Sequence, residues 1–410
     1  MVGVHSGKFI AERETPRIAD AARRLGLGHP VVNDRQFRVW RSYAVRAWPT
    51  IVVIDAEGYV RGMHAGEFTT EMVAPAVEEL IAEAGDKLMS TASPHVDEAR
   101  PRDALRYPGK VAIDDRTLAI ADSGNDRIVI ARIEPNHDHA RVVAIHGGTR
   151  GYRDGGDPWF DHPQGLLFDG QDLLVADAFN HVIRAIDLAS GETRTVAGTG
   201  MQLRTRRDAA AGALSSPWDL ARAGDRIAIA MAGNHRLYLL DKNARKAVHL
   251  AGSGAEEIHD GQLETAALAQ PMGIGGDAST IWFADSETSA IRSAALAPTG
   301  LVTTIVGTGL FDFGDVDGEG TAVRLQHAQG VVRMPDGRLL VVDSYNDALK
   351  WLDPESRRVT TWVRGLHEPG GAVLGDGVVY VADTNAHRIA VVRIDDASVR
   401  TLELDWSGVS

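Results

Sequence analysis

Cysteine is absent from all 410 residues of this chain. Its own residues therefore cannot form a disulfide, a thiolate nucleophile, a cysteine-bound metal site or a thiol redox cycle. Long apolar runs are missing as well: no stretch reaches the roughly 18 apolar residues that mark a membrane-spanning helix. The first residues, Met1 to His5, lack the basic segment and apolar core of a secretory signal. We therefore expect a cytoplasmic protein without a membrane segment.

Basic residues are fewer than acidic ones. The chain holds 43 lysines and arginines against 56 aspartates and glutamates, for a net charge of −13. Most of this negative charge falls beyond residue 86. Proteins that bind phosphate backbones usually carry a net basic domain. The charge balance thus argues against a nucleic-acid partner.

The chain does contain a two-part sequence motif that is repeated six times. Each copy opens with a Pro-x-Gly-like triplet, and the six triplets are Pro108-Gly109-Lys110, Pro163-Gln164-Gly165, Pro217-Trp218-Asp219, Pro271-Met272-Gly273, Ala328-Gln329-Gly330 and Pro369-Gly370-Gly371. An Asp-x-x-Asn-like turn follows each opening, at Asp122 to Asn125, Asp177 to Asn180, Met231 to Asn234, Asp285 to Thr288, Asp343 to Asn346 and Asp383 to Ala386. A repeat of this length indicates a solenoid, an array or a propeller.

Short β-rich runs decide among these architectures. The second unit, for example, contains Leu173–Ala176, Val182–Ile186 and Thr193–Val196, with turn residues between them. Three such runs follow each strand-like opening, and no helix-period stretch interrupts them. Each unit therefore supplies four strands. The sequence predicts a mainly β fold, a six-bladed β-propeller over residues 105–410.

A cation accompanies the repeat in every blade. Six positions after the repeat Asp an apolar residue always stands, and a neighbouring position holds Arg127, Arg184, Arg236, Arg292, Lys350 or Arg388. Period-two alternation places the apolar residue in the blade packing and the cation on the other strand face. The cations could form a ring that binds polyanions. Because the domain is acidic, we expect each to pair with acidic neighbours on its own blade.

The repeat Asp and Asn residues allow a functional and a structural interpretation. A ring of carboxylates could bind a metal, yet Asx side chains also satisfy backbone groups at turns. The replacements Met231, Thr288 and Ala386 interrupt the ring. We therefore interpret these residues as scaffold.

Histidines follow the same period. His181, His235 and His387 come after the Asn-like turn position, while His162 and His327 stand beside blade openings. Several histidines that converge on a propeller channel could bind zinc for a lyase or hydrolase. Because their positions recur with the repeat, we interpret them as scaffold and expect neither a metal nor another cofactor.

One acidic loop resembles half of a calcium site. Asp315, Asp317 and Glu319 alternate around Gly318, but the remaining ligands of a calcium loop are missing. A weaker form of the same pattern lies at Asp154. We expect solvated turns at both places.

Four long connections carry the candidate binding surface. Residues 147–162, 198–216, 252–270 and 307–327 each join an outer strand to the next inner strand, so they emerge on one face of the ring. The candidate binding residues on this loop face are Arg150, Asp154, His162, Trp218, Asp315, Asp317 and His327.

Residues 1–86 have a different pattern, and residues 87–104 are expected to form a linker. We expect strands over 2–5, 29–33, 50–55 and 59–64 and helices over 15–25, 36–43 and about 69–84. Such an order describes an α/β module that ends in a hairpin and a helix. Proline at the start of the third strand suits a cis bond or a sheet edge.

The segment Ala47-Trp48-Pro49-Thr50 resembles the cis-proline loop of thioredoxin-like domains. Further phrases resemble the thioredoxin-like, NHL-repeat-containing protein family along nearly the whole chain. They are Val2-Gly-Val-His-Ser-Gly-Lys-Phe9, His29-Pro-Val-Val-Asn-Asp34, Ser216-Pro-Trp-Asp219, Ala230-Met-Ala-Gly233, Phe313-Gly-Asp-Val-Asp-Gly318, Asp343-Ser-Tyr-Asn346 and Val381-Ala-Asp-Thr-Asn385. The resemblance implies that the module lies against the propeller, with Trp48, Pro49 and Thr50 lining a cleft.

The chain also departs from that family. Members carry a strand, a Cys motif and a helix before the segment at Val2, and they often continue beyond the propeller with another β-rich domain. We expect the module to be incomplete, to begin too late or to dock on the propeller, with unpaired edges and exposed apolar surface.

From these observations we predict a non-catalytic binding or scaffold protein, monomeric, with a protein or peptide partner on the loop face and in the cleft. Two alternatives stay open. A Cys motif upstream of Met1 would indicate a thiol-disulfide oxidoreductase, and bound metal in the propeller channel would indicate a lyase or hydrolase.

Overall fold

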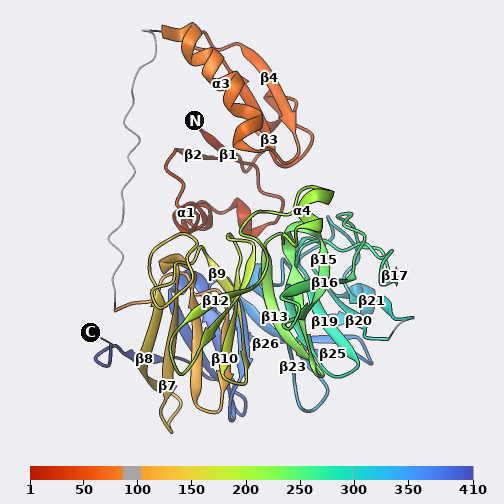
Figure 1. Cartoon of the computed structure of the whole chain (residues 1–410). Coiled ribbons are helices and arrows are strands. Elements are labelled where there is room, and N and C mark those ends of the chain that lie inside the picture. The colour runs from red at the N-terminus through yellow and green to blue at the C-terminus, as the bar shows by residue number, and fades with distance from the viewer. Residues whose placement is uncertain (86–102, 298, 410) are drawn as a thin grey trace. The chain divides into compact units, whose positions relative to one another are not determined.

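The chain divides into two compact units, Met1–Ala99 and Arg100–Ser410, and each is described by itself. The structure is a computed structural model that describes residues 1–85, 103–297 and 299–409 (Figure 1). The linker expected over 87–104 lies almost wholly outside the described residues. Among the described helices, none is long and apolar enough to cross a bilayer.

The second unit is a six-bladed β-propeller, as the repeat predicts. Each blade is an antiparallel sheet whose strands follow one another in sequence. The first three blades consist of β5 (Val111–Asp114), β6 (Thr117–Asp122), β7 (Arg127–Ile133) and β8 (His139–Gly147); β9 (Pro163–Asp169), β10 (Asp172–Asp177), β11 (Val182–Asp187) and β12 (Thr193–Ala197); β13 (Pro217–Ala223), β14 (Arg226–Met231), β15 (Arg236–Asp241) and β16 (Lys246–Ala251). The last three consist of β18 (Pro271–Gly276), β19 (Thr280–Asp285), β20 (Ala290–Ala295) and β21 (Leu301–Val306); β23 (Gly330–Arg333), β24 (Leu339–Asp343), β25 (Ala348–Asp353) and β26 (Arg358–Arg364); β27 (Pro369–Leu374), β28 (Val378–Asp383), β29 (Arg388–Arg393) and β30 (Val399–Thr401).

The ring is closed. Innermost strands of consecutive blades contact one another all the way round, including β27 of the last blade with β5 of the first. The C-terminal strand β31 (Glu403–Asp405) then pairs in parallel with β8, at the outer edge of the first blade. Two short strands from the connections, β17 (Gly261–Gln262) and β22 (Gly318–Glu319), likewise extend the fourth and fifth blades.

The core is divided among the blade junctions. Six apolar clusters each combine side chains from two adjacent blades. Because every blade is covered on both faces, its second strand reads as a continuous apolar run, as Leu173–Ala176 does with no exposed residue. The apolar position after each repeat turn is buried in all six blades, as predicted, and four of the six accompanying cations are buried as well.

The first unit contains the elements that the sequence predicts, within one or two residues at each end. They are β1 (Gly3–His5), α1 (Thr15–Arg24), β2 (Val31–Asn33), α2 (Arg38–Ser42), β3 (Thr50–Ile54), β4 (Val60–Ala65) and α3 (Thr70–Ala84). β1 and β2 pair in parallel, whereas β3 and β4 form a separate antiparallel pair. The expected exposed apolar surface is present on both pairs, at Val4 and Val32 and at Ile54, Val60 and Met63. The thioredoxin likeness of this unit stays a prediction.

Candidate functional site

The propeller has two faces with different loops. Connections from one blade to the next, and the turns between second and third strands, lie at one end of the blades, the loop face. Turns between first and second strands, and between third and fourth strands, lie at the other end, which we call the turn face. The connection over 198–216 includes a short helix, α4 (Arg206–Ala210), which Figure 1 shows in green.

The repeat aspartate joins three parts of its blade. One carboxylate oxygen accepts a hydrogen bond from the backbone N–H two residues before the blade opening, and the other lies against the cation of the third strand. The carboxylates of Asp122, Asp177, Asp285, Asp343 and Asp383 receive the N–H of Arg106, Asp161, Ala269, Gln326 and His367 at 2.6 to 2.9 Å. Their partner cations are Arg127, Arg184, Arg292, Lys350 and Arg388, at 2.7 to 3.3 Å. The structural interpretation is thus supported, although the N–H belongs to the blade opening rather than to the turn, and the expected pairing with an acidic neighbour holds for five of the six cations but not for Arg236.

Two of these aspartates, Asp177 and Asp343, have a raised pKa for a structural reason. Burial raises the pKa of Asp177 to about 7 and that of Asp343 to about 6, against the hydrogen bonds and cations that favour ionisation. A raised pKa in an open cleft would point to catalysis. Here both carboxyl groups are fully buried and hydrogen-bonded on both oxygens, so the shift reflects burial in the scaffold.

The third blade shows how the site adapts without its aspartate. Met231 takes the position, and its Sδ accepts the N–H of Ser215 at 3.4 Å. The cation of that blade, Arg236, turns instead to the carbonyl oxygens of Gly252 and Ser253, at 3.1 and 2.6 Å. The cation therefore stays fixed at the blade even where its usual carboxylate is missing.

A ring of hydrogen bonds fastens each blade to the next. The residue after each repeat turn is left-handed, with φ between 51° and 57°, and its side chain accepts the N–H of the residue just before the next blade opening. These interblade clasps are Asp126 to His162, His181 to Ser216, His235 to Gln270, Ser289 to His327, Asp347 to Glu368 and His387 to Tyr107, at 2.9 to 3.1 Å. Aspartate and histidine are among the few residues that adopt a left-handed conformation readily. The histidines at this position are therefore scaffold, as interpreted from the repeat.

At four junctions a hydroxyl adds a second bond between blades. The residue after the repeat Asp donates to the carbonyl oxygen of the first residue in the next opening. The pairs are Ser123 with Pro163, Ser286 with Ala328, Ser344 with Pro369 and Thr384 with Pro108. Blade order is thus fixed by polar contacts at the loop face as well as by the apolar clusters.

The acidic loops are fastened to their own blades. Asp317 accepts the backbone N–H and the hydroxyl of Thr361 at 2.7 and 2.8 Å, and its Oδ1 lies 3.4 Å from Lys350 Nζ. Asp315 lies 2.6 Å from the same ammonium group and also pairs with Arg364. Burial alone would raise the pKa of Asp317, but the bonds from Thr361 and Lys350 outweigh it and hold that pKa below its usual range.

Two other connections repeat this arrangement. Asp154 accepts the N–H of Thr195 at 2.9 Å and pairs with Arg184, and Asp260 accepts the N–H of Thr304 at 2.8 Å and pairs with Arg292. Asp260 was missed at the sequence level. The signal that could have found it is an Asp-Gly pair that recurs at residues 154, 260 and 317. The turns at Asp154, Asp315 and Asp317 are exposed to solvent, as expected, and their carboxylates also bond within the chain.

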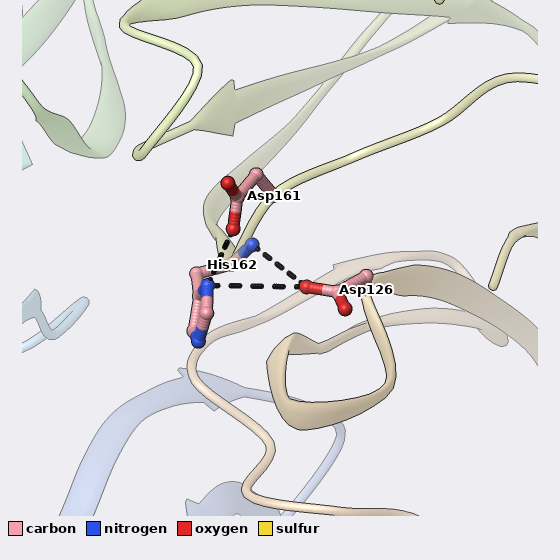
Figure 2. Close-up of side chains that lie close together, drawn as sticks. All are labelled: Asp126, Asp161 and His162. Carbon is pink, nitrogen blue, oxygen red and sulfur yellow. Dashed lines mark hydrogen bonds and ion pairs between the residues drawn. The ribbon is translucent and has the colours of Figure 1, made fainter. Parts of the chain in front are cut away.

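One cluster on the loop face has the composition of a cation site. Figure 2 shows Asp126, Asp161 and His162, whose ligand atoms lie within 4.8 Å of one another. His162 Nδ1 is 2.6 Å from Asp161 and 3.9 Å from Asp126. Arg150 already lies against both carboxylates, at 3.2 Å from Asp126 and 3.7 Å from Asp161. With this guanidinium in place, the cluster is a hydrogen-bonded network around Arg150.

The central channel is crossed by an ion pair. Four blade openings have glycine at their third residue, but the first and third blades have Lys110 and Asp219 there. Their charged atoms lie 3.3 Å apart, and Lys110 also donates to the carbonyl oxygen of Gln329 in the fifth blade. A Cβ on Gly371 would lie 2.6 Å from Lys110 Cδ, so this level of the channel is packed. Burial is the main cause that lowers the pKa of Lys110 and raises that of Asp219.

Trp218 stands beside this pair in the opening of the third blade. Its ring is partly exposed, but its indole N–H is buried and has no hydrogen-bond partner among the described residues. His327, the other candidate at a blade opening, is buried and stacks on Tyr345 at 4.4 Å. Of the candidates, the structure brings together Arg150 and His162; Asp315 and Asp317 form a separate group.

Around the second blade, the loop face exposes a group of apolar and cationic side chains. We name Arg150, Tyr152, Phe179 and Met201 the blade-2 patch. His162 joins Arg150 to Phe179, since it lies 3.5 Å from the guanidinium and stacks on the phenyl ring at 4.4 Å. The Tyr152 ring packs against Gly200, next to Met201. Met201 is 70% exposed, and the other three side chains are about two-fifths exposed.

The first unit presents an aromatic surface around its candidate residues. Trp48 is 46% exposed, lies 4.5 Å from the Trp40 ring and donates its indole N–H to Ser6 O at 2.8 Å. The Trp48–Pro49 peptide bond is cis. Thr50 donates its hydroxyl to Ala47 O at 2.7 Å. Trp48 and Pro49 are therefore the accessible members of this candidate set, and Thr50 supports the turn.

Asp34 holds this aromatic surface in place. It is buried, and its carboxylate accepts the N–H groups of Arg38, Val39 and Trp40 and the hydroxyl of Ser6. Burial would raise the pKa of Asp34, but these hydrogen bonds outweigh it and keep that pKa low. An ionised Asp34 thus fixes the start of α2 and with it Trp40.

Fold and repeat together define the second unit as a six-bladed β-propeller, and its sequence is similar to that of NHL repeat-containing proteins. In sequence, the chain is 34% identical to NHL repeat-containing protein 2 of Bos taurus, over 97% of this chain and 62% of that protein. It is also 34% identical to the chloroplastic protein SUPPRESSOR OF QUENCHING 1 of Arabidopsis thaliana, over 98% of this chain and 42% of that protein. The similarity to these relatives supports the resemblance to NHL-repeat proteins.

The chain spans 42% to 63% of the length of the curated relatives that it matches over nearly its whole length. No family model matches it. Among solved structures, a structural genomics protein of unknown function from Bacteroides thetaiotaomicron has a TM-score of 0.50 at 14% identity and covers 70% of each chain, a likeness of fold alone. Since one relative is named as chloroplastic, the cytoplasmic location stays a prediction.

Proposed function

We propose that this chain is a non-catalytic binding protein and that the blade-2 patch is where its propeller engages a protein or peptide. The observation that carries the proposal is the contrast on one face. The carboxylates of Asp154, Asp260, Asp315 and Asp317 and the histidines of the clasps are engaged within the chain, whereas Tyr152, Phe179 and Met201 are exposed around Arg150. Tyrosine, phenylalanine, methionine and arginine are the residues that protein interfaces favour.

The charge next to this patch indicates the chemistry of the partner. The connection over 198–216 carries Arg204, Arg206 and Arg207 against a single acidic residue, whereas the connection over 252–270 has four acidic residues and no lysine or arginine. The three arginines are exposed. Exposed charges of this kind steer association and select partners more than they add affinity. The partner segment is therefore acidic, with an apolar side chain for Met201 and Tyr152.

Trp48 and Pro49 supply a second accessible surface on the first unit, and we propose it as a further contact for the same class of partner. Its support is the exposed indole ring, held by Trp40 and Ser6.

Site-specific photo-crosslinking tests the proposal. The full chain is produced in its own source cells with a benzophenone amino acid in place of Met201. The control protein carries the same amino acid in place of Leu188, on the turn face of the same blade. We expect a discrete protein adduct at position 201 that is lost when Arg204, Arg206 and Arg207 are changed to Glu. Changing Arg226, an exposed arginine on the turn face, to Glu should leave the adduct intact. Equal adducts at both positions, or an adduct that survives the charge reversal, would refute the proposal.

A further inference from the structure

A concave site lies on the turn face, at the junction between the last and the first blade. It is a cavity of about 320 Å³, at the lower end of the range for small-molecule sites. The first blade contributes Ile113 and Arg116 from one turn and Ile133 and His137 from another, and the last blade contributes Asp376 and Tyr380. This site is at the opposite end of the blades from the blade-2 patch and does not depend on the function proposed there.

Part of the cavity lining is formed by a polar pair, Tyr380 and His137. Tyr380 is fully buried, and its hydroxyl lies 3.0 Å from His137 Nδ1. Burial raises the pKa of Tyr380 to about 12, with a smaller opposing effect from Arg116. The phenol therefore stays protonated under all physiological conditions, and it and His137 satisfy each other.

Two charged groups of the lining have no counterpart among the described residues. Arg116 Nη2 is buried and makes no hydrogen bond in the described part of the chain. A buried donor without an acceptor is unfavourable by about 1–3 kcal/mol and more for a charged group, so such groups normally have a partner. Asp376, also in the lining, is exposed and forms no ion pair within residues 103–297 and 299–409. Asp115, which also lines the site, lies 3.7 Å from Arg132.

We propose that this cavity binds a free aliphatic α-amino acid. The ligand carboxylate would meet Arg116, whose planar guanidinium suits a carboxylate, and the ammonium group would meet Asp376. The aliphatic side chain would pack on Ile113 and Ile133. One unpaired cation, one unpaired anion and an apolar wall within one small cavity are what a zwitterion with a short hydrocarbon chain requires.

Calorimetric titration of the full chain with L-leucine tests this assignment. We expect saturable binding with a dissociation constant in the millimolar range or tighter. Leucinamide, which lacks the carboxylate, and 4-methylpentanoate, which lacks the ammonium group, should each bind at least about tenfold more weakly. The variants R116Q and D376N should show the same loss for leucine. The matched control is R132Q, which changes the exposed arginine next to the cavity and should bind leucine like the wild type.

Arg116→Gln is expected to fold, because Nη2 has no hydrogen bond to lose, and the two analogues test the wild-type chain whether or not a variant is stable. Absence of saturable leucine binding would overturn the proposal. Binding of 4-methylpentanoate as tight as that of leucine would also overturn it. Binding of a leucyl dipeptide where leucine does not bind would overturn it too, because the ligand would then be the end of a peptide and not a free amino acid. Crosslinking at Met201 is independent of each of these outcomes.

Discussion

His387 Nδ1 accepts the backbone N–H of Tyr107 at 3.1 Å, between residues 280 positions apart. The two rings also meet edge to face at 4.3 Å. This contact is the interblade clasp between the sixth and the first blade, and it has the same geometry as the five clasps between blades that are neighbours in sequence.

Removing this clasp should destabilise the propeller. His387→Ala leaves the Tyr107 N–H unpaired and puts alanine at a φ of 55°, so we expect a loss of about 2 kcal/mol in the free energy of unfolding. His387→Asn keeps an acceptor and tolerates the left-handed conformation, and it should lose less than half as much. Urea unfolding measures both, with the surface change His139→Ala as control. Equal losses for alanine and asparagine would show that the acceptor does not matter.

Stability should fall at acidic pH through His181. Its Nδ1 accepts the Ser216 N–H at 3.0 Å, and burial, with a further contribution from Arg204, lowers its pKa. The unfolded chain therefore takes up a proton near pH 6.5 while the folded chain does not, so unfolding is favoured as the pH falls below 6.5, by at most about 1.4 kcal/mol per pH unit. His181→Asn should flatten the dependence of unfolding free energy on pH between 7.5 and 5.5. Parallel curves for wild type and variant would contradict this mechanism.

Restoring the sixth aspartate should be tolerated. Met231 is fully buried, yet Asp at this position would find the Ser215 N–H and the Arg236 guanidinium that its five counterparts use. We expect Met231→Asp to change the unfolding free energy by less than about 2 kcal/mol, because the buried charge is paired. Ile229→Asp, two residues earlier on the same strand, should prevent folding or lose more than about 4 kcal/mol, because that charge has no partner. Thermal unfolding compares the two.

The ion pair in the channel should show strong coupling. Lys110→Met leaves Asp219 as an unpaired buried charge, and Asp219→Asn does the same to Lys110, so each should lose about 3–5 kcal/mol. The double variant removes both charges and keeps an amide oxygen for one of the two N–H groups, those of Leu220 and Ile274, that bind the carboxylate, so it should recover part of the loss. A double-mutant cycle in guanidinium chloride measures the coupling. Additive losses would mean that the two charges do not stabilise each other.

The acidic connections should be insensitive to calcium. Because Lys350 and Thr361 already satisfy Asp317, neither calcium nor a chelator should move the melting temperature. Asp317→Ala should lower the free energy of unfolding by about 1–3 kcal/mol. Asp260→Ala should have the same effect, because Asp260 makes the corresponding bonds in the fourth blade. A rise in melting temperature with calcium that Asp317→Ala abolishes would restore the calcium interpretation.

The repeat allowed much of the propeller to be predicted. Strands, turns and the scaffold role of the histidines follow from positions that recur in every blade, so six copies support each inference. The hydrogen bond that Asp177 accepts from the N–H of Asp161 could not be predicted in this way, because the sequence shows that an Asx residue stands at a turn but not which backbone group approaches it.

The channel pair and the turn-face cavity were harder for another reason. Lys110 and Asp219 meet across the ring axis, and the only sequence signal is that they replace glycine at the third residue of an opening. The cavity combines Arg116 with Tyr380, which are non-repeating residues of the first and last blades. Sequence periodicity reports what the blades share, whereas these sites depend on what distinguishes one blade from another.

The closure of the ring has a consequence for how the chain can be connected. Both ends of the propeller are fastened to the first blade, since Ala104 O accepts from Arg127 and β31 pairs with β8. All six junctions carry a clasp at the same two backbone positions, including the one that joins the last blade to the first. A circular permutant whose new ends lie in the exposed turn at Lys242 would therefore retain every clasp. Its blades would be translated in a different order but would occupy the same positions in the ring.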